Sequence, residues 1–341
     1  MASNSSFDLK TGGLEVARTY SAQASGRTVL VTGVSVDTLG DAIVRSFAEG
    51  GASVIIITGR SDERLAEVIK ALSSDYPSTK FRPLKFDLAS LKSVHAAAQE
   101  LLDDTTIPQI DILVACGGLH DFKDERTLTV DGLELHLGVN HMSHHHFITQ
   151  LLPKLRASAK KSAPGTTRVI MIASQVWACS PFRFSDYNFD GNPLAADEKG
   201  HFELLTAAFG TQPTDGYDHT IAYAQSKTAN ALFAVHANEI WASENISAFA
   251  LHPGIVGTQS AAPLFDSLPK ETVAKFGFMK TIDQGAATAL VAALDPGLKP
   301  EGGVTLEDCQ ITSVPEWVTD KEKAAKLWAL SEELISSKLA A

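Results

Sequence analysis

The sequence is short of cysteine and of long apolar runs. Its 341 residues include only 3 cysteines, Cys116, Cys179 and Cys309, which cannot form a paired disulfide framework and show no metal-ligand spacing. Its clean apolar stretches, such as the one around Val54 to Ile57, are far too short to cross a bilayer. The sequence therefore predicts free thiols in a reducing compartment and no stable membrane insertion.

Positive charge is scarce as well. Lys and Arg number 29 against 40 Asp and Glu, which leaves a formal net charge of −11. An acidic surface repels phosphate backbones, so nucleic acid is an unfavourable partner. Residues 1–26 lack the apolar core of a signal peptide and are expected to form a polar, partly disordered leader. These absences favour a soluble, cytoplasmic protein.

What the sequence does contain, after Gly26, is a regular alternation of β-branched runs and helical segments, which is typical of βαβ units around a parallel sheet. The expected strands are Thr28–Thr32, Ser53–Thr58, Lys80–Phe86, Ile110–Ala115, Arg168–Ala173, Ile246–Leu251 and a short one at Val304–Leu306. The expected helices include Leu39–Glu49, Asp62–Ser73, Leu91–Asp103, a long one from about Gly132 to Arg156, and an amphipathic C-terminal one over Asp320–Leu339. The fold class is therefore predicted as α/β, a single Rossmann-type, doubly wound parallel sheet of about seven strands with helices on both faces.

No composition shift or internal repeat divides the chain, so residues 27–341 are expected to form one domain. Two segments are additions to it, a loop-rich insertion near 180–218 and a segment from about Gln259 to Lys280. Loops at the carboxyl ends of parallel strands build ligand sites in this fold class. Aromatic residues in and beside the insertion predict a bulky, fairly apolar substrate; they are Trp177, Phe182, Phe184, Tyr187 and Phe189.

The turn after the first expected strand reads TGVSVDTLG. Backbone N–H groups at the start of a helix attract a diphosphate, and glycines let the backbone approach it closely. Here Gly33 and Gly40 are seven residues apart, and Asp37 and Thr38 stand where a further glycine is expected. An ordinary strand–turn–helix connection would fit this spacing as well, so the turn alone leaves both interpretations open.

The second expected strand ends at Gly59 and Arg60, with no acidic residue before them. Folds that hold NAD usually place an acid there for the ribose hydroxyls, whereas an arginine accommodates the extra phosphate of NADP. This position favours NADP(H) over NAD(H). The alternative is an exposed arginine beside a helix that begins at Ser61.

Tyr223 and Lys227 form the sharpest pattern, in the helical segment HTIAYAQSKTANALFAVHANEI. Residues four apart share one helix face. A nearby ammonium favours the phenolate, which would lower the pKa of Tyr223 and suit it to proton transfer. The fifth expected strand brings Ser174 to its carboxyl end, where a hydroxyl could polarise a carbonyl.

Over about Gly26 to Asp308, the chain resembles the short-chain dehydrogenase/reductase superfamily, and within it the retinol-dehydrogenase-like and fungal metabolic reductases. The segments that carry the resemblance are TGVSVDTLG, GRSDERL, KFDLASL, DILVACGG, DGLELHLGVNHMSH, RVIMIAS, YAQSKTANALFAV, LHPGIVGT and KTIDQGAATALVAALDP. The resemblance implies that Tyr223 is the catalytic acid/base and that Lys227 holds the nicotinamide ribose and lowers the tyrosine pKa. It also implies that Ser174 orients the substrate carbonyl and that Asn140 supports a water-linked proton relay.

The cofactor site implied by the resemblance is extended. Its residues are Gly33, Ser35, Leu39, Gly40, Arg60, Asp87, Leu88, Gly117, Asn140, Tyr223, Lys227, Pro253, Gly254, Val256 and Thr258. Asp87 would contact the adenine, and Pro253 through Thr258 would close over the nicotinamide and diphosphate. The chain departs from the family pattern in two places. Its glycine turn is one residue longer and lacks the middle glycine, and the usual NNAG after the fourth strand is replaced by ACGG (115–118).

The resulting hypothesis is an NADP(H)-dependent oxidoreductase that interconverts a carbonyl and an alcohol on a bulky, fairly apolar small molecule. A secondary metabolite is the first substrate class and a retinoid- or steroid-like molecule the second. A non-oxidative isomerase or cyclase, or a cofactor-binding regulatory relative, is the alternative. Histidines at 136, 141 and 144–146 are expected to serve packing and to bind no metal. The expected assembly is a monomer or a homodimer.

Overall fold

A parallel sheet forms the centre of the molecule. The computed structural model describes residues 2–123, 125–209, 216–258, 270–275 and 277–340. Within them, eight strands follow the order β3-β2-β1-β4-β5-β6-β7-β8. The strands are β1 (Thr28–Val31), β2 (Val54–Gly59), β3 (Lys80–Lys85), β4 (Ile112–Ala115), β5 (Thr167–Ile172), β6 (Ile246–Leu251), β7 (Thr305–Glu307) and β8 (Gln310–Ile311). All pair in parallel except β7 with β8, so the predicted doubly wound α/β fold is confirmed, with an antiparallel eighth strand added.

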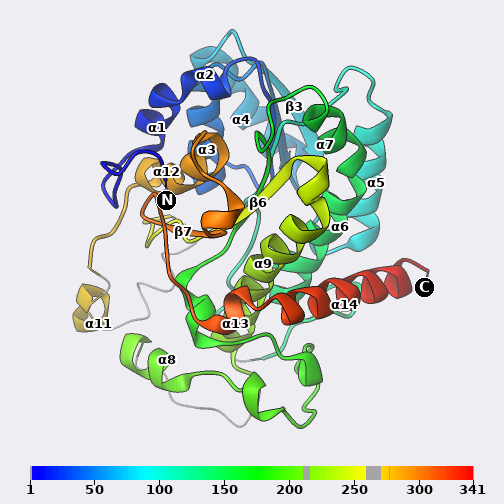
Figure 1. Cartoon of the computed structure of the whole chain (residues 1–341). Helices are drawn as coiled ribbons and strands as arrows, with labels where there is room; N and C mark the ends of the chain where they lie inside the picture. The colour runs from blue at the N-terminus through cyan, green and yellow to red at the C-terminus, as the bar shows by residue number, and fades with distance from the viewer. Residues whose placement is uncertain (1, 124, 210–215, 259–269, 276, 341) are drawn as a thin grey trace.

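Helices cover both faces of this sheet because its strands are apolar on both sides. Val29 and Val31 of β1 point into one buried cluster, whereas Leu30 between them points into the other. The first face is covered by α3 (Leu39–Glu49), α4 (Asp62–Asp75) and α12 (Ile282–Leu294), and the second by α5 (Leu91–Asp103), α6 (Ser143–Gln150), α7 (Leu152–Ala159) and α9 (His219–Trp241) (Figure 1).

The N-terminal segment is packed, and the expectation of a partly disordered leader is wrong. It forms α1 (Gly13–Thr19) and α2 (Ser21–Ala24), and α1 lies against α3 and α12 (Figure 1). Val16 and Ala17 have no exposed surface, and a Cβ on Gly13 would lie 2.9 Å from the Ala286 side chain. Asp283 on α12 accepts the backbone N–H of Leu14 at 3.0 Å. The few apolar residues of this segment therefore complete the first buried face.

The long helix expected from Gly132 to Arg156 is divided. A π-helical segment over Leu137–Met142 carries Asn140, α6 follows it, and α7 begins after a break at Leu151. Pro153 in the first turn of α7 has no N–H to continue the ladder from α6, which explains the break. π-Helical turns often lie at functional sites, since they redirect side chains.

The insertion near 180–218 is largely packed onto the protein itself. It contains the 3₁₀ turns Phe184–Asp186 and Ala196–Glu198 and helix α8 (Phe202–Phe209). Phe182, Trp177 and Phe189 are buried with relative exposures of 1%, 3% and 8%. Because their rings are packed inside the protein, these three residues no longer support the prediction of a bulky, fairly apolar substrate. Residues 210–215 of the insertion and 259–269 of the segment expected at Gln259–Lys280 lie outside the described residues.

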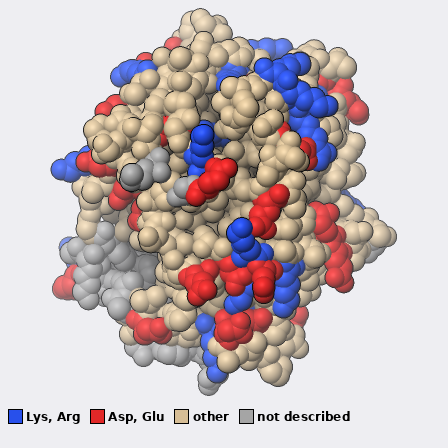
Figure 2. All heavy atoms as spheres, viewed as in Figure 1, with Lys and Arg blue, Asp and Glu red and all other residues tan. Residues whose placement is uncertain are grey.

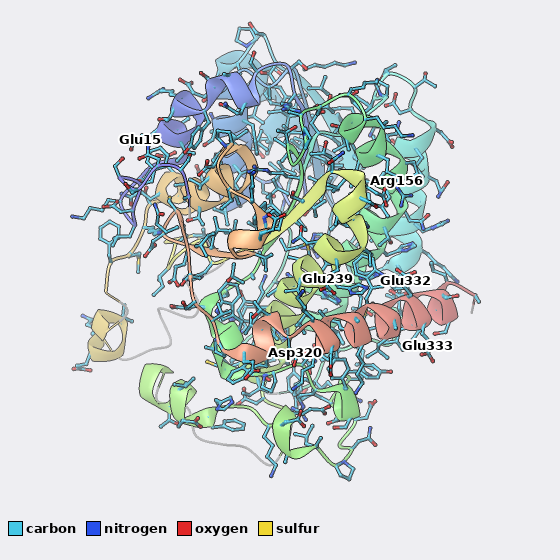
Figure 3. All side chains as sticks on the ribbon, viewed as in Figure 1. Glu15, Arg156, Glu239, Asp320, Glu332 and Glu333 are labelled. Carbon is cyan, nitrogen blue, oxygen red and sulfur yellow. The ribbon has the colours of Figure 1, made fainter. Side chains whose placement is uncertain are left out.

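The C-terminal helix docks on the domain. Helix α14 (Lys321–Ala340), preceded by α13 (Glu316–Thr319), lies across α9 (Figure 1). Trp328 packs on Phe233 at 5.1 Å between ring centroids, and His145 bonds Glu332 at 2.6 Å. Figure 3 shows Glu332 on the side of α14 toward α6 and α9.

The outer surface mixes charges of both signs. On the face drawn in Figure 2, acidic side chains gather over the lower half, with basic side chains among them. Among the described residues, no helix combines the length and the apolar character needed to cross a membrane.

Candidate active site

The candidate site lies at the carboxyl ends of the parallel strands, where β5 delivers Ser174 and α9 delivers Tyr223 and Lys227. Helix α9 begins sharply because the Asp218 carboxylate caps it, accepting the N–H groups of Thr220 at 2.8 Å and Ile221 at 2.9 Å. The four-residue spacing then places Tyr223 and Lys227 one turn apart on the helix face toward β5. The structure thus brings these three residues together, as the sequence predicts.

Lys227 is held by the last residue of β5. Its Nζ donates to the Ile172 carbonyl at 3.0 Å and lies 5.4 Å from the Tyr223 ring centroid. The side chain is only 5% exposed, and burial lowers the pKa of its ammonium to about 8.

Tyr223 is half-buried, and the pKa of its phenol differs from the expected one. Burial raises the pKa of its phenol to about 12, and a hydrogen bond with Ser174 offsets part of that rise. The expectation that Lys227 lowers this pKa is wrong for the structure, because the ammonium is directed to the Ile172 carbonyl and burial dominates. At neutral pH the phenol is therefore protonated.

Asn140 ties the loop after β4 to the tyrosine helix. Its side-chain oxygen accepts the Leu119 N–H at 2.9 Å, and its Nδ2 donates to the Leu119 carbonyl and to the Ser226 hydroxyl, both at 3.0 Å. Ser226 in turn donates to the Tyr223 carbonyl at 2.7 Å. Asn140 thus lies within two hydrogen bonds of the backbone of Tyr223.

The glycine turn passes very close to the end of β4. Gly33 has φ +71°, and a Cβ there would lie 2.4 Å from the Gly117 Cα. A Cβ on Gly40, at the start of α3, would lie 2.8 Å from the Gly33 carbonyl oxygen. Asp37 replaces the missing middle glycine and adopts a left-handed conformation, φ +58°. The hydroxyl of Thr38, which caps α3, donates to the Ser35 carbonyl at 2.7 Å.

The altered ACGG segment is held by partners other than the missing asparagines. The Gly117 N–H donates to the Thr32 hydroxyl at 2.9 Å, and Asn140 holds both polar backbone groups of Leu119. Gly118 is exposed, and a Cβ there would lie 2.9 Å from the Asn140 side-chain oxygen and 3.7 Å from the Lys227 Nζ. Gly33 and Gly118 are exposed and carry no side chain, so they leave backbone open at the place where the family holds its cofactor, and these residues fit such a group.

The remaining expected cofactor residues surround the same edge of the sheet. Leu39 and Val256 converge, since both would contact a Cβ placed on Gly285, at 3.3 Å and 2.6 Å. A Cβ on Gly117 would lie 2.7 Å from a methyl group of Leu88. The other expected residues occupy the segments after β2, β3 and β6; they are Arg60, which is exposed, Asp87, which accepts the Ala89 N–H, and Pro253, Gly254 and Thr258.

His120 is a site residue that spacing arguments missed. Its imidazole stacks on the Tyr223 ring, with centroids 4.1 Å apart and planes 6° from parallel. Its Nε2 lies 3.2 Å from Nδ1 of His219 on α9. Burial lowers the pKa of His120 well below its usual range, helped by His136 and His219. It follows the ACGG segment in a loop, where no periodic pattern marks it.

The histidines of the 136–146 region have protein partners. His141 contacts the Asn230 and Ser331 side chains at 3.4 and 3.2 Å, and His145 bonds Glu332. Among the described residues, no group of three or more His, Cys, Asp or Glu side chains is arranged to hold a metal ion.

Comparison with known proteins decides the family. The oxidoreductase fscI of Fusarium equiseti is 38% identical over 249 residues, which cover 73% of this chain and 94% of that protein. The chain belongs to the short-chain dehydrogenase/reductase superfamily. Consistently, the model of the short chain dehydrogenase family matches residues 27–188. Retinol dehydrogenase 14 of Mus musculus is 29% identical, with 91% of this chain and 86% of that protein covered.

Solved structures show the same fold. The NADPH-bound carbonyl reductase from chicken fatty liver superimposes with a TM-score of 0.61 at 18% identity, covering 85% of this chain and 99% of that chain. The Rossmann-type fold is therefore shared with these structures, and the sequence relatives identify the chain as an oxidoreductase of the short-chain dehydrogenase/reductase superfamily.

Proposed function

We propose that this short-chain dehydrogenase/reductase interconverts a carbonyl and an alcohol with NADP(H), and that Tyr223 exchanges the proton. The observation that carries the proposal is the convergence of Ser174, Tyr223 and Lys227. Ser174 and Tyr223 are 49 residues apart in sequence, yet their side chains are hydrogen-bonded. Lys227 donates a hydrogen bond to the strand that leads to Ser174. A helix surface without a function would not require all three.

The protonation state of Tyr223 suits the reducing direction. When bound, the nicotinamide cofactor supplies the hydride to the carbonyl carbon. As the carbonyl oxygen gains negative charge, the Tyr223 O–H donates its proton to it and the Ser174 hydroxyl donates a hydrogen bond. A pKa of about 12 keeps the tyrosine protonated and ready to donate at neutral pH. Lys227 would hold the nicotinamide ribose, and Asn140 would support the return of the proton.

Glycines 33 and 40 and the ACGG segment would hold the diphosphate against the start of α3. Arg60 favours the phosphate of NADP(H), because it is exposed at the end of β2 and makes no ion pair within the described residues. The nearby acid Asp62 is engaged with Lys85 at 2.6 Å. The NADPH carried by the chicken carbonyl reductase supports the same cofactor.

A bulky, fairly apolar alcohol or carbonyl compound is the proposed substrate class. The support comes from the retinol dehydrogenase relatives, which are named for such an alcohol. A secondary metabolite remains within this class. We also propose a cytoplasmic location.

The experiment that tests the proposal replaces Tyr223 with Phe, which removes only the hydroxyl. We expect kcat on an accepted carbonyl substrate to fall by at least about 10²-fold with NADPH binding retained. Tyr76→Phe is the matched control, since Tyr76 lies at the end of α4 and should leave kcat unchanged. A Tyr223→Phe enzyme that keeps most of its activity would refute the acid role.

Cofactor binding is tested separately by fluorescence titration of the purified protein with NADPH and NADH. No binding of either would overturn the proposed function. Tight NADPH binding without turnover on any carbonyl or alcohol of a broad panel would favour a regulatory or non-oxidative relative instead.

A further inference from the structure

A buried histidine connects the glycine turn to the tyrosine helix. His144, the second residue of α6, has no exposed surface. Its Nε2 lies 2.8 Å from the Thr32 hydroxyl, and its Nδ1 lies 3.1 Å from the Asn140 carbonyl oxygen. Thr32 directly precedes Gly33 of the turn, and Asn140 bonds Ser226 on α9.

The hydrogen-bond partners determine where each proton lies. The Gly117 N–H donates to the Thr32 oxygen at 2.9 Å, and the Thr32 O–H donates to Nε2 of His144, because Nε2 is the acceptor nitrogen of a neutral ring whose proton lies on Nδ1. The Asn140 carbonyl can only accept, so Nδ1 of His144 must carry the ring proton. Every member is thereby satisfied with a neutral histidine in the Nδ1–H tautomer. Burial lowers the pKa of His144 to about 4, which agrees with a neutral ring.

We propose that His144 is a positioning residue that couples the cofactor turn to the catalytic helix, on top of the function proposed above. Its acceptor nitrogen orients the Thr32 hydroxyl, which holds the Gly117 N–H and with it the Gly33–Gly117 approach. Its N–H holds the Asn140 carbonyl, and the Asn140 side chain continues to Ser226 and the backbone of Tyr223. A fully satisfied buried network of this kind fixes one arrangement of its members.

Two conservative variants separate the two halves of the network. In His144→Asn, the side-chain amide can replace Nδ1–H toward Asn140 but cannot reach Thr32. In His144→Gln, the longer side chain can accept from Thr32 but removes the side-chain donor from the Asn140 carbonyl. Losing one buried hydrogen bond corresponds to about a five- to tenfold effect.

We therefore expect opposite responses. His144→Asn should weaken NADPH binding about five- to tenfold with kcat within about twofold, because the glycine turn is released. His144→Gln should lower kcat by about the same factor with the NADPH Kd within about twofold, because Asn140 is released. Thr32→Val should mimic His144→Asn, and the double variant should add little, since both remove the same bond.

His146→Gln is the matched control. His146 lies two residues further along α6, is 5% exposed and contacts His95 at 3.2 Å, away from the site. It should change neither the NADPH Kd nor kcat. Nitrogen-15 NMR of the histidine rings should show the Nδ1–H tautomer for one resonance that disappears in His144→Gln.

A purely structural role would lower the melting temperature of both His144 variants equally and leave Kd and kcat of the folded fraction unchanged, which would overturn the proposal. An Nε2–H tautomer would overturn it as well. If the wild-type protein binds NADPH but the two His144 variants do not differ in their effects on the NADPH Kd and on kcat, the coupling alone is refuted. A wild-type protein that binds no nicotinamide cofactor refutes the proposed function.

Discussion

Arg60 is the residue on which we expect cofactor choice to depend. Its guanidinium is exposed at the end of β2, in a chain with 11 more acidic than basic side chains, so it concentrates positive charge where the 2′-phosphate of NADP(H) would lie. We predict that Arg60→Asp raises the NADPH Kd about tenfold or more and leaves the NADH Kd within about threefold, as measured by fluorescence titration.

The control for this prediction is Lys70→Asp. Lys70 is also exposed, lies further along α4, and gives the same change in net charge. It should alter neither Kd by more than about twofold, since exposed charges at a distance are screened by salt. Equal losses of NADPH and NADH in Arg60→Asp would contradict the assignment.

We expect His120 to affect catalysis through the face of the Tyr223 ring that it covers. Burial raises the pKa of Tyr223, so removing the cover should admit water and lower that pKa from about 12 toward 10. Reduction requires the protonated phenol, so in His120→Ala the activity should fall off at lower pH on the alkaline side than in the wild type.

His120→Phe is the companion variant, because it keeps a ring over Tyr223 and removes the nitrogens. A pH–kcat profile that matches the wild type would assign the effect to burial. A profile that shifts like that of His120→Ala would instead assign it to the hydrogen bond with His219.

At the scale of elements, the turn between β1 and α3 contains two positions, Gly33 and Asp37, at which we expect substitutions to have opposite effects. Gly33→Ala would place a Cβ 2.4 Å from the Gly117 backbone at φ +71°, so we predict a loss of roughly 1–3 kcal/mol in unfolding free energy. Because the same turn would hold the diphosphate, the NADPH Kd should rise about tenfold or more.

Asp37→Gly in the same turn should behave oppositely. Asp37 is exposed at φ +58°, a conformation that glycine adopts freely, so stability should stay within about 1 kcal/mol of the wild type. Removing a carboxylate beside the N-terminus of α3 should tighten NADPH binding severalfold. Weaker binding in Asp37→Gly would show that this acid supports the site.

At the scale of the whole molecule, α14 closes the outer side of α9. Trp328 contacts Phe233, with ring centroids 5.1 Å apart, and the His145 ring at 4.5 Å. Because this helix occupies the outer faces of α6 and α9, we expect the protein to be a monomer in light scattering. Trp328→Ala should lower the unfolding free energy by about 2–4 kcal/mol in denaturant titration.

Glu333→Ala is the control for this packing, since Glu333 is exposed on the opposite side of α14 (Figure 3). It should change stability by less than about 0.5 kcal/mol. A stable Trp328→Ala protein would mean that α14 contributes little to the fold. A homodimer in solution would mean that pairing uses another surface.

Features that depend on residues close together in the chain could be predicted from the sequence. The strands were recognisable because a sheet covered on both faces needs continuous apolar runs, as at Val54–Ile57. Tyr223 and Lys227 were recognisable because four residues make one helix turn. The capped start of α4 at Ser61 is local in the same way.

Only the tertiary structure decided features that join distant residues. The N-terminal segment is packed because Asp283 and Ala286, far along the chain, complete its surroundings. Trp177, Phe182 and Phe189 are likewise buried in clusters that contain residues distant in sequence. The raised pKa of Tyr223 depends on burial, which no spacing encodes. The contact of His144 with Thr32 spans 112 residues and exists only because the sheet brings β1 beside the helices after β4. The sequence by itself therefore determined the fold class and indicated the residue types of the proposed site, and the folded chain decided their hydrogen-bond partners and their burial.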